Sequence, residues 1–142
     1  MEKRNPVVHF EMGYHDSKRM QKFYKIFGWK TKEMGPEMGN YVVAETTETD
    51  ANQMVKTPGA INGGFYEKTK DPQSHAPSIV ISVEDIHAAM KAVKAAGGKI
   101  LGSMDQSGKR TMEPTEIPGV GLWISAMDTE ENRFSILQPK RK

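Results

Sequence analysis

Two stretches of this chain alternate apolar and polar residues, as a strand with one buried face does. In residues 7–12 every second side chain is apolar, which leaves His9 and Glu11 together on the opposite face. Residues 78–83 repeat the alternation, and there the second face begins with Ser78. Because residues two apart on a strand share a face, each strand is expected to pack its apolar side chains against a helix and to carry its other side chains on the opposite face of the sheet.

Each strand is followed by a helical pattern with a capping residue at its start. Asp16 and Asp85 are suitable N-caps, since a carboxylate there accepts hydrogen bonds from backbone N–H groups of the first turn. Gly28 and Gly97 mark the two helix ends, where a left-handed residue is common. The apolar residues of the first helix recur at helical spacing and are expected to be core: Met20, Phe23, Tyr24 and Phe27.

The two strand–helix units are copies of one another at an offset of 69 residues. Without any gap, residues 9–30 lie over residues 78–99. The identical pairs sit at helix starts and ends and at a later phenylalanine: Asp16/Asp85, Lys22/Lys91, Lys25/Lys94, Gly28/Gly97, Lys30/Lys99 and Phe65/Phe134. A tandem repeat of this size indicates one fold unit that is used twice.

Shorter strands complete each copy as a βαβββ unit. They are expected at residues 29–33, 41–45 and 63–68 in the first copy, and at residues 99–103, 121–127 and 133–138 in the second. Helices on one face of mixed sheets predict an α+β fold. Two long polar stretches, residues 46–60 and 103–118, are interpreted as loops.

Composition narrows the class of protein. At 142 residues the chain is long enough for one domain with a substantial core. Its 20 basic and 18 acidic residues are scattered and leave a net charge of +2, which argues against a nucleic-acid protein. The absence of cysteine excludes disulfides and thiol chemistry. No signal-peptide core or membrane-spanning apolar run is evident, so we expect a cytoplasmic protein without nucleic-acid or membrane partners.

The segments HFEM and FYKIFGW near the start, with AAGGKI closing the second helix, carry a family resemblance. In a tandem βαβββ chain they resemble the vicinal oxygen chelate superfamily, which includes glyoxalase I, extradiol dioxygenases, and the bleomycin and fosfomycin resistance proteins. Within it, the chain is most similar to glyoxalase-like bacterial proteins. The resemblance implies a single glyoxalase-like domain over residues 1–142. Module one is expected at about 7–68 and module two at about 78–138, with their sheets paired into a curved mixed-sheet cleft.

The resemblance also implies four positions that supply ligands in metal-using members, one on the first and one on the last strand of each module. The repeat offset places them at His9, Tyr66, Ser78 and Ser135. One imidazole, one phenol and two hydroxyls make a poor site for a divalent ion, and Glu11 adds only one carboxylate. We therefore expect neither a metal nor another cofactor, with a divalent ion as the less favoured alternative.

His9 and Glu11 are the candidate catalytic residues, for proton transfer within the implied cleft. The alternatives are a histidine held in a structural network and a carboxylate solvated at an open end of the sheet. Trp123 alternates with aliphatic neighbours, so it either lines the cleft or packs in the core. Tyr41 and Tyr66 both suit a cleft wall, and the repeat favours Tyr66. The candidate substrate-binding residues are Tyr66, Ser78, Trp123 and Ser135.

Three functions are consistent with these residues. The first is a metal-independent protein that binds or sequesters a small organic molecule, as some drug-resistance relatives do. The second is a glyoxalase-like lyase or isomerase, in which His9 and Glu11 move a proton next to a carbonyl. The third is a non-catalytic protein–protein module. Open sheet edges also leave room for a homodimer.

Overall fold

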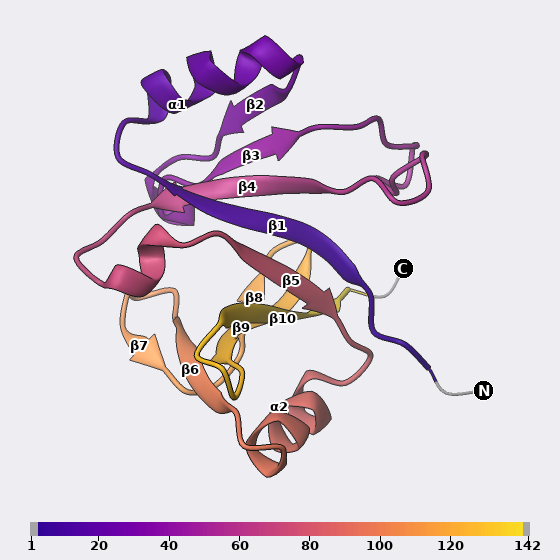
Figure 1. Ribbon diagram of the computed structural model, residues 1–142, viewed down its shortest axis with the longest axis vertical. Coiled ribbons are helices and arrows are strands. Elements are labelled where there is room, and N and C mark those ends of the chain that lie inside the picture. Colours follow the sequence, from indigo (N-terminus) through magenta and orange to yellow (C-terminus); the bar gives the residue numbers. More distant parts are fainter. Residues whose placement is uncertain (1–2, 141–142) are drawn as a thin grey trace. The chain divides into compact units, whose positions relative to one another are not determined.

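The computed structural model describes residues 3–140 and has the α+β architecture that the sequence pattern predicts (Figure 1). Contacts divide these residues into two compact units. The first half comprises residues 9–77, and the second half comprises residues 78–140 together with residues 3–8. Residues 3–8 are tied to the second half by a hydrogen bond of 2.9 Å from the Ser82 amide to the Pro6 carbonyl.

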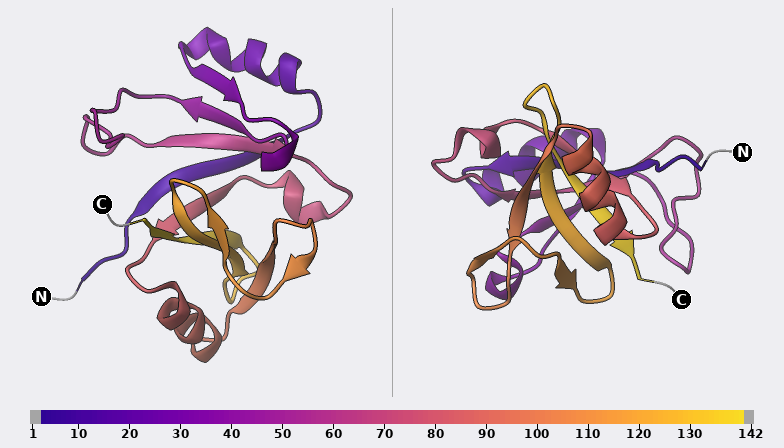
Figure 2. Two further views of the ribbon diagram at one scale, coloured as in Figure 1. Left: turned by 180° about the vertical axis from the view of Figure 1, so that it is seen from behind. Right: turned by 90° about the horizontal axis from the view of Figure 1, so that it is seen from below.

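The first half is a sheet with one α-helix packed against it (Figure 2). Its elements are β1 (Val7–Tyr14), α1 (Ser17–Tyr24), the 3₁₀ helix η1 (Lys25–Phe27), β2 (Lys30–Glu33), the 3₁₀ helix η2 (Pro36–Met38), β3 (Val42–Glu45), β4 (Asn62–Glu67) and the 3₁₀ helix η3 (Pro72–His75). The strand order is β2-β3-β4-β1. Strands β1 and β4 run parallel, and Glu11 lies level with Gly64 in that pair.

The second half repeats this arrangement with additional strands. Its elements are β5 (Ser78–Ser82), α2 (Ile86–Ala95), β6 (Lys99–Met104), β7 (Arg110–Thr111), β8 (Thr115–Ile117), β9 (Gly121–Met127) and β10 (Arg133–Pro139). The strand order is β5-β10-β9-β6-β7, and β8 pairs with β9. Strands β5 and β10 run parallel, as the corresponding pair does in the first half. No helix within residues 3–140 is long and apolar enough to cross a membrane.

Strands β7 and β8 correct the expectation of a plain loop over residues 103–118. Both strands are too short to show a hydrophobic alternation in the sequence. Strand β7 pairs with β6 and β8 pairs with β9, and side-chain hydrogen bonds support the segment: the Ser103 hydroxyl donates to the Glu113 carbonyl at 2.8 Å, and the Thr115 hydroxyl donates to the Met104 carbonyl at 2.8 Å. Strand pairing and polar side chains together therefore order a segment whose composition alone indicates no regular structure.

Both helices begin where the sequence predicts, and α2 ends just before Gly97, whereas α1 ends at Tyr24 and only the 3₁₀ helix η1 continues to Gly28. The Asp16 carboxylate accepts from the Arg19 amide at 3.0 Å, and the Asp85 carboxylate accepts from the Ala88 amide at 3.1 Å. Each bond satisfies an amide that has no partner within its own helix. After η1 the chain turns at Gly28 with φ of +78°, a left-handed conformation that glycine adopts at little cost.

Each half has its own hydrophobic core between helix and sheet. In the second half, buried residues of α2, β6, β9 and β10 meet, with Ile86, Ile124 and Ile136 at the centre. In the first half, aromatic residues dominate. Phe65 is buried at the centre, and around it pack side chains of α1 and the neighbouring strands: Phe10, Met12, Met20, Tyr24 and Trp29. The apolar faces inferred for β1, β5 and β9 are thus the faces that meet the helices.

Two residues of the predicted helix stripe do not lie in this core. Met20 and Tyr24 pack inward, whereas Phe23 is 55% exposed and Phe27 is 63% exposed. The Tyr24 ring stacks on Trp29 with ring centres 4.7 Å apart, and these two rings fill the space beneath the helix. Phe27 is left at the rim with Ile26, which is 69% exposed. An exposed apolar cluster such as Phe23, Ile26 and Phe27 is also what a protein–protein module would present.

Replacing Phe65 with alanine is expected to lower the free energy of unfolding by about 3–5 kcal/mol, because it empties the centre of the first half's core. Phe27→Ala is the matched control and should cost less than about 1 kcal/mol, since that ring is mostly solvated. Urea unfolding followed by tryptophan fluorescence measures both changes. Equal losses would show that Phe27 belongs to the core, as the helical spacing predicted.

Candidate functional site

In the first half, one phenol joins the two candidate catalytic residues. The Tyr41 hydroxyl donates to the Glu11 carboxylate at 3.1 Å, and it lies 3.0 Å from Nε2 of His9. With Tyr41 as donor to Glu11, its oxygen is left to accept from an Nε2–H of His9. Glu11 is buried, and His9 is partly buried. The structure therefore brings His9 and Glu11 together through a residue that the sequence analysis ranked below Tyr66.

The position of Tyr41 depends on a glycine. Tyr41 immediately precedes β3, and Gly64 lies on the neighbouring strand β4, level with Val43. A Cβ atom at Gly64 would fall within van der Waals overlap of the Tyr41 hydroxyl and ring, so only glycine leaves room for this ring. On the opposite face Gly63 makes the same room for Phe10. Paired glycines inside a strand are the sequence signal for such a close approach.

Burial sets the protonation state of this site. It lowers the pKa of His9 from 6.5 to about 4, so the imidazole is neutral at physiological pH. Burial also raises the pKa of the Tyr41 hydroxyl, and the nearby Glu11 carboxylate raises it further. Tyr41 therefore remains a protonated hydrogen-bond donor. A neutral imidazole and a phenol beside a carboxylate suit recognition of a polar ligand or transfer of a proton.

Tyr66 lies close enough to this group to influence it electrostatically. It follows Gly64 by two residues on β4, so it shares the face that Tyr41 covers. The Tyr66 hydroxyl donates to the Ala76 carbonyl at 3.3 Å. An electrostatic contribution from Tyr66 to the raised pKa of Tyr41 is consistent with this proximity.

The other candidate residues lie in the second half, on the sheet face that points away from α2. On β9 and β10 the residues Ile124, Ala126 and Ile136 pack in the helix-facing core. Their strand neighbours Trp123, Ser125 and Ser135 are therefore on the opposite face. Ser135 is level with Ser125 on β9 and with Val80 on β5. Ser78 lies two residues before Val80 on the same face of β5.

Ser125 lies on the same face, although the sequence analysis did not select it; its alternation with the core residues of β9 indicates that face. Ser78, Ser125 and Ser135 are all buried. In the described part of the chain, the hydroxyl groups of Ser78 and Ser125 have no hydrogen-bond partner. Trp123 is partly buried and lies level with Leu137 on β10. The face thus combines buried hydroxyls with an indole.

The residues do not fit a divalent metal. Within either half, no three His, Cys, Asp or Glu side chains of residues 3–140 gather closely enough to hold a metal ion. His9 is the imidazole at the four positions implied by the resemblance, and its Nε2 already contacts the Tyr41 hydroxyl. Serine hydroxyls at Ser78 and Ser135 are weak substitutes for imidazole or carboxylate ligands.

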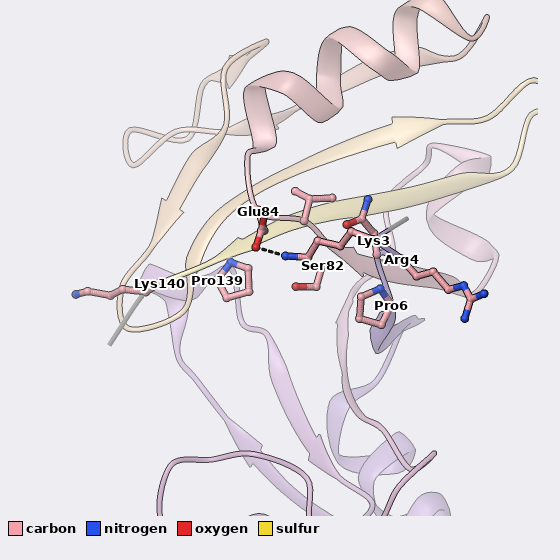
Figure 3. A pocket seen from close by; sticks show the side chains of 9 residues that line it. Lys3, Arg4, Pro6, Ser82, Glu84, Pro139 and Lys140 are labelled. Carbon is pink, nitrogen blue, oxygen red and sulfur yellow. Dashed lines mark ion pairs between the residues drawn. The ribbon is translucent and has the colours of Figure 1, made fainter. Parts of the chain in front are cut away.

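A separate hollow of about 410 Å³ lies in the second half (Figure 3). It is lined by residues 3–6, residues 82–84 and residues 139–140, and the Lys3–Glu84 ion pair lies within it. Neither Ser78, Trp123 nor Ser135 lines this hollow. The candidate residues of the second half therefore belong to the sheet face and not to this surface depression.

Comparison with known proteins gives a family and a set of similar folds. Residues 7–131 match the family described as the Glyoxalase/Bleomycin resistance protein/Dioxygenase superfamily. No curated protein matches the chain. A hypothetical protein from Bacillus halodurans C-125 is similar, with a TM-score of 0.65 and 15% identity over 99% of this chain and 98% of that chain.

Two methylmalonyl-CoA epimerase structures are similar to the same extent. One has a TM-score of 0.65 and 14% identity over 99% of this chain and 100% of that chain. The other, from Streptomyces coelicolor in complex with 2-nitronate-propionyl-CoA, has a TM-score of 0.65 and 12% identity over 96% of this chain and 99% of that chain. Identities this low show a common fold, and a common fold does not establish a common reaction.

The His9 ring is expected to titrate near pH 4, which NMR of its ring protons measures directly. Because the folded pKa lies below the ordinary 6.5, the unfolded chain takes up the proton first as the pH falls. The stability that the neutral ring contributes is therefore complete above about pH 6.5 and is lost as the pH falls toward 4.

His9→Gln provides the control for this pH dependence. The difference in unfolding free energy between the wild type and this variant should narrow between about pH 6.5 and pH 4.5. Carboxylates that titrate in this range are present in both proteins, so their contributions cancel in the difference between the two unfolding free energies. A His9 titration midpoint near 6.5, or a constant difference between the two proteins, would contradict the buried, neutral imidazole.

Proposed function

We propose that this chain, which belongs to the Glyoxalase/Bleomycin resistance protein/Dioxygenase superfamily, is a small-molecule-binding protein that works without the family's metal centre. The membership confirms the resemblance inferred from HFEM and FYKIFGW. The observation that carries the proposal is the contact between Nε2 of His9 and the Tyr41 hydroxyl. At the position where the resemblance implies a metal ligand, the imidazole is already bound to a phenol.

The chemistry of the first half supports binding without a metal. The Tyr41 hydroxyl uses its proton on Glu11 and its oxygen on His9, so both side chains are oriented by protein atoms. A metal ligand is usually oriented by a second group through its other ring nitrogen, which leaves the first nitrogen for the metal. Here Nε2 of His9 is already hydrogen-bonded to the Tyr41 hydroxyl.

The second half supports the same proposal through its serine residues. Hydroxyl groups at Ser78 and Ser135 are hydrogen-bonding groups suited to a polar organic ligand. Trp123 on the same sheet face adds a flat apolar surface of the kind that small-molecule sites use. These features recognise organic molecules better than they hold cations.

Native mass spectrometry of the untagged protein, with elemental analysis of the same sample, tests this proposal. We expect less than stoichiometric divalent metal, and a small organic molecule that leaves the protein on denaturation. His9→Ala should not change the metal content, because none is bound. A stoichiometric metal that His9→Ala removes and that the exposed-residue control His87→Ala retains would overturn the proposal.

A second candidate function is a glyoxalase-like lyase or isomerase, and the His9–Tyr41–Glu11 group is the observation that favours it. Isomerisation next to a carbonyl requires one group to remove a proton and another to supply a hydrogen bond or a proton. Glu11 and Tyr41 can fill these roles, because they already share a hydrogen bond of 3.1 Å. The reaction would proceed without the electrostatic help that a metal gives to an enediolate.

Turnover of hemithioacetals, with and without added divalent ions, tests this second function. If it holds, Glu11→Gln and His9→Ala are expected to lower kcat by about 100-fold or more, the usual contribution of a general acid or base. His87→Ala, which changes an exposed histidine on α2, should leave the rate unchanged. Turnover that is absent in all variants, or equal in all of them, would remove the enzyme hypothesis.

A further inference from the structure

Helix α1 and its continuation η1 carry exposed apolar side chains beside exposed basic ones. Residues at spacings of three, four and seven share one face of a helix, and four exposed residues stand at this spacing: Arg19, Lys22, Phe23 and Ile26. Phe27 adjoins them, because the centre of its ring lies 6.3 Å from that of Phe23. These five residues form the outward face of α1, and each of its three apolar side chains is more than half exposed.

The second copy of the repeat shows that the fold unit does not require these large side chains. At the offset of 69 residues, alanine occupies the positions that correspond to Arg19, Phe23, Ile26 and Phe27, namely Ala88, Ala92, Ala95 and Ala96. Helix α2 nevertheless packs on its own sheet through Ile86 and Met90. The phenylalanines and the isoleucine on the outward face of α1 are therefore additions to the unit, and their exposure requires an explanation outside the fold.

The surroundings of this face are basic. Residues 17–32 include six basic residues and no acidic one, although the net charge of the whole chain is only +2: Lys18, Arg19, Lys22, Lys25, Lys30 and Lys32. Lys18 is paired with Glu33 at 3.1 Å. The side chains of Arg19, Lys22 and Lys25 form no ion pair with any other residue between positions 3 and 140. Unpaired positive charges beside protruding apolar groups are complementary to a surface with anionic headgroups over an apolar interior.

We propose that the outward face of α1 docks on an anionic lipid surface. Phe23, Ile26 and Phe27 enter the boundary between the headgroups and the acyl chains. Arg19 and Lys22 bind anionic headgroups, because their long stems can lie along apolar surface while their charged ends stay in the polar layer.

A lipid surface fits this face better than an acidic protein does. Lipid accepts protruding apolar side chains in any arrangement, whereas a protein partner must provide a pocket shaped for each of them. The contact is peripheral and needs no spanning segment, so it departs from the expectation of no membrane partner that rested on the lack of a long apolar run. It goes beyond the proposed binding of a small molecule and does not depend on it.

Flotation of the full chain with lipid vesicles tests the docking surface. The vesicles consist of phosphatidylcholine alone or of an equimolar mixture of phosphatidylcholine and phosphatidylserine. We expect binding to the anionic vesicles to be at least about tenfold tighter, and to weaken as the salt concentration rises from about 0.1 M to about 1 M. Equal binding to both vesicles, or binding to neither, would overturn the proposal. Binding to polyglutamate without binding to vesicles would assign an acidic protein partner instead.

Substitutions matched across the repeat test the residues. Lys22→Gln is expected to weaken binding to the anionic vesicles by about fivefold, whereas Lys91→Gln, at the corresponding exposed position of α2, should leave it unchanged. Ile26→Ala and Phe27→Ala, which introduce the alanines of the second copy, should each weaken binding by about tenfold and leave the Tm nearly unchanged. Val120→Ala, at an exposed apolar residue of the second half, is their control. Equal effects at matched positions, or unchanged binding by all variants, would contradict the assignment.

Discussion

The Tyr41 hydroxyl is the contact on which the chemistry of the first half depends. It bridges an imidazole and a carboxylate, and it gives the buried Glu11 a hydrogen-bond donor. A buried carboxylate without a donor would be strongly destabilising. The bridge in turn requires a glycine at position 64, because any larger residue would occupy the volume of the Tyr41 ring. One missing side chain on β4 therefore makes room for the hydrogen bonds of two residues on β1.

The tandem repeat carries different chemistry in its two copies. When the two copies are aligned at their sequence offset, the residues of the first-half site correspond to residues of another kind in the second copy: His9/Ser78, Glu11/Val80, Gly64/Arg133 and Tyr66/Ser135. Where the first half omits a side chain to admit a phenol, the second half has a guanidinium group. Where the first half buries a carboxylate, the second half buries an aliphatic residue. The fold unit has been kept, and the polar face of each copy has been specialised separately.

The fold was largely readable from local signals. Alternation gave the faces of β1, β5 and β9, and the caps at Asp16 and Asp85 gave the helix starts, because each depends on residues near in sequence. The bridge by Tyr41 was not readable in this way, since it depends on how β3 and β4 align with β1. The exposure of Phe27 was not predicted either, because helical spacing identifies an apolar stripe without showing how wide the sheet beneath it is.

The site of the first half offers no positive charge to a ligand. A neutral His9 and a protonated Tyr41 bring no positive charge to the first half's site, and Glu11 makes that site unfavourable for an anion. The first half's site therefore suits a neutral polar group better than an anion.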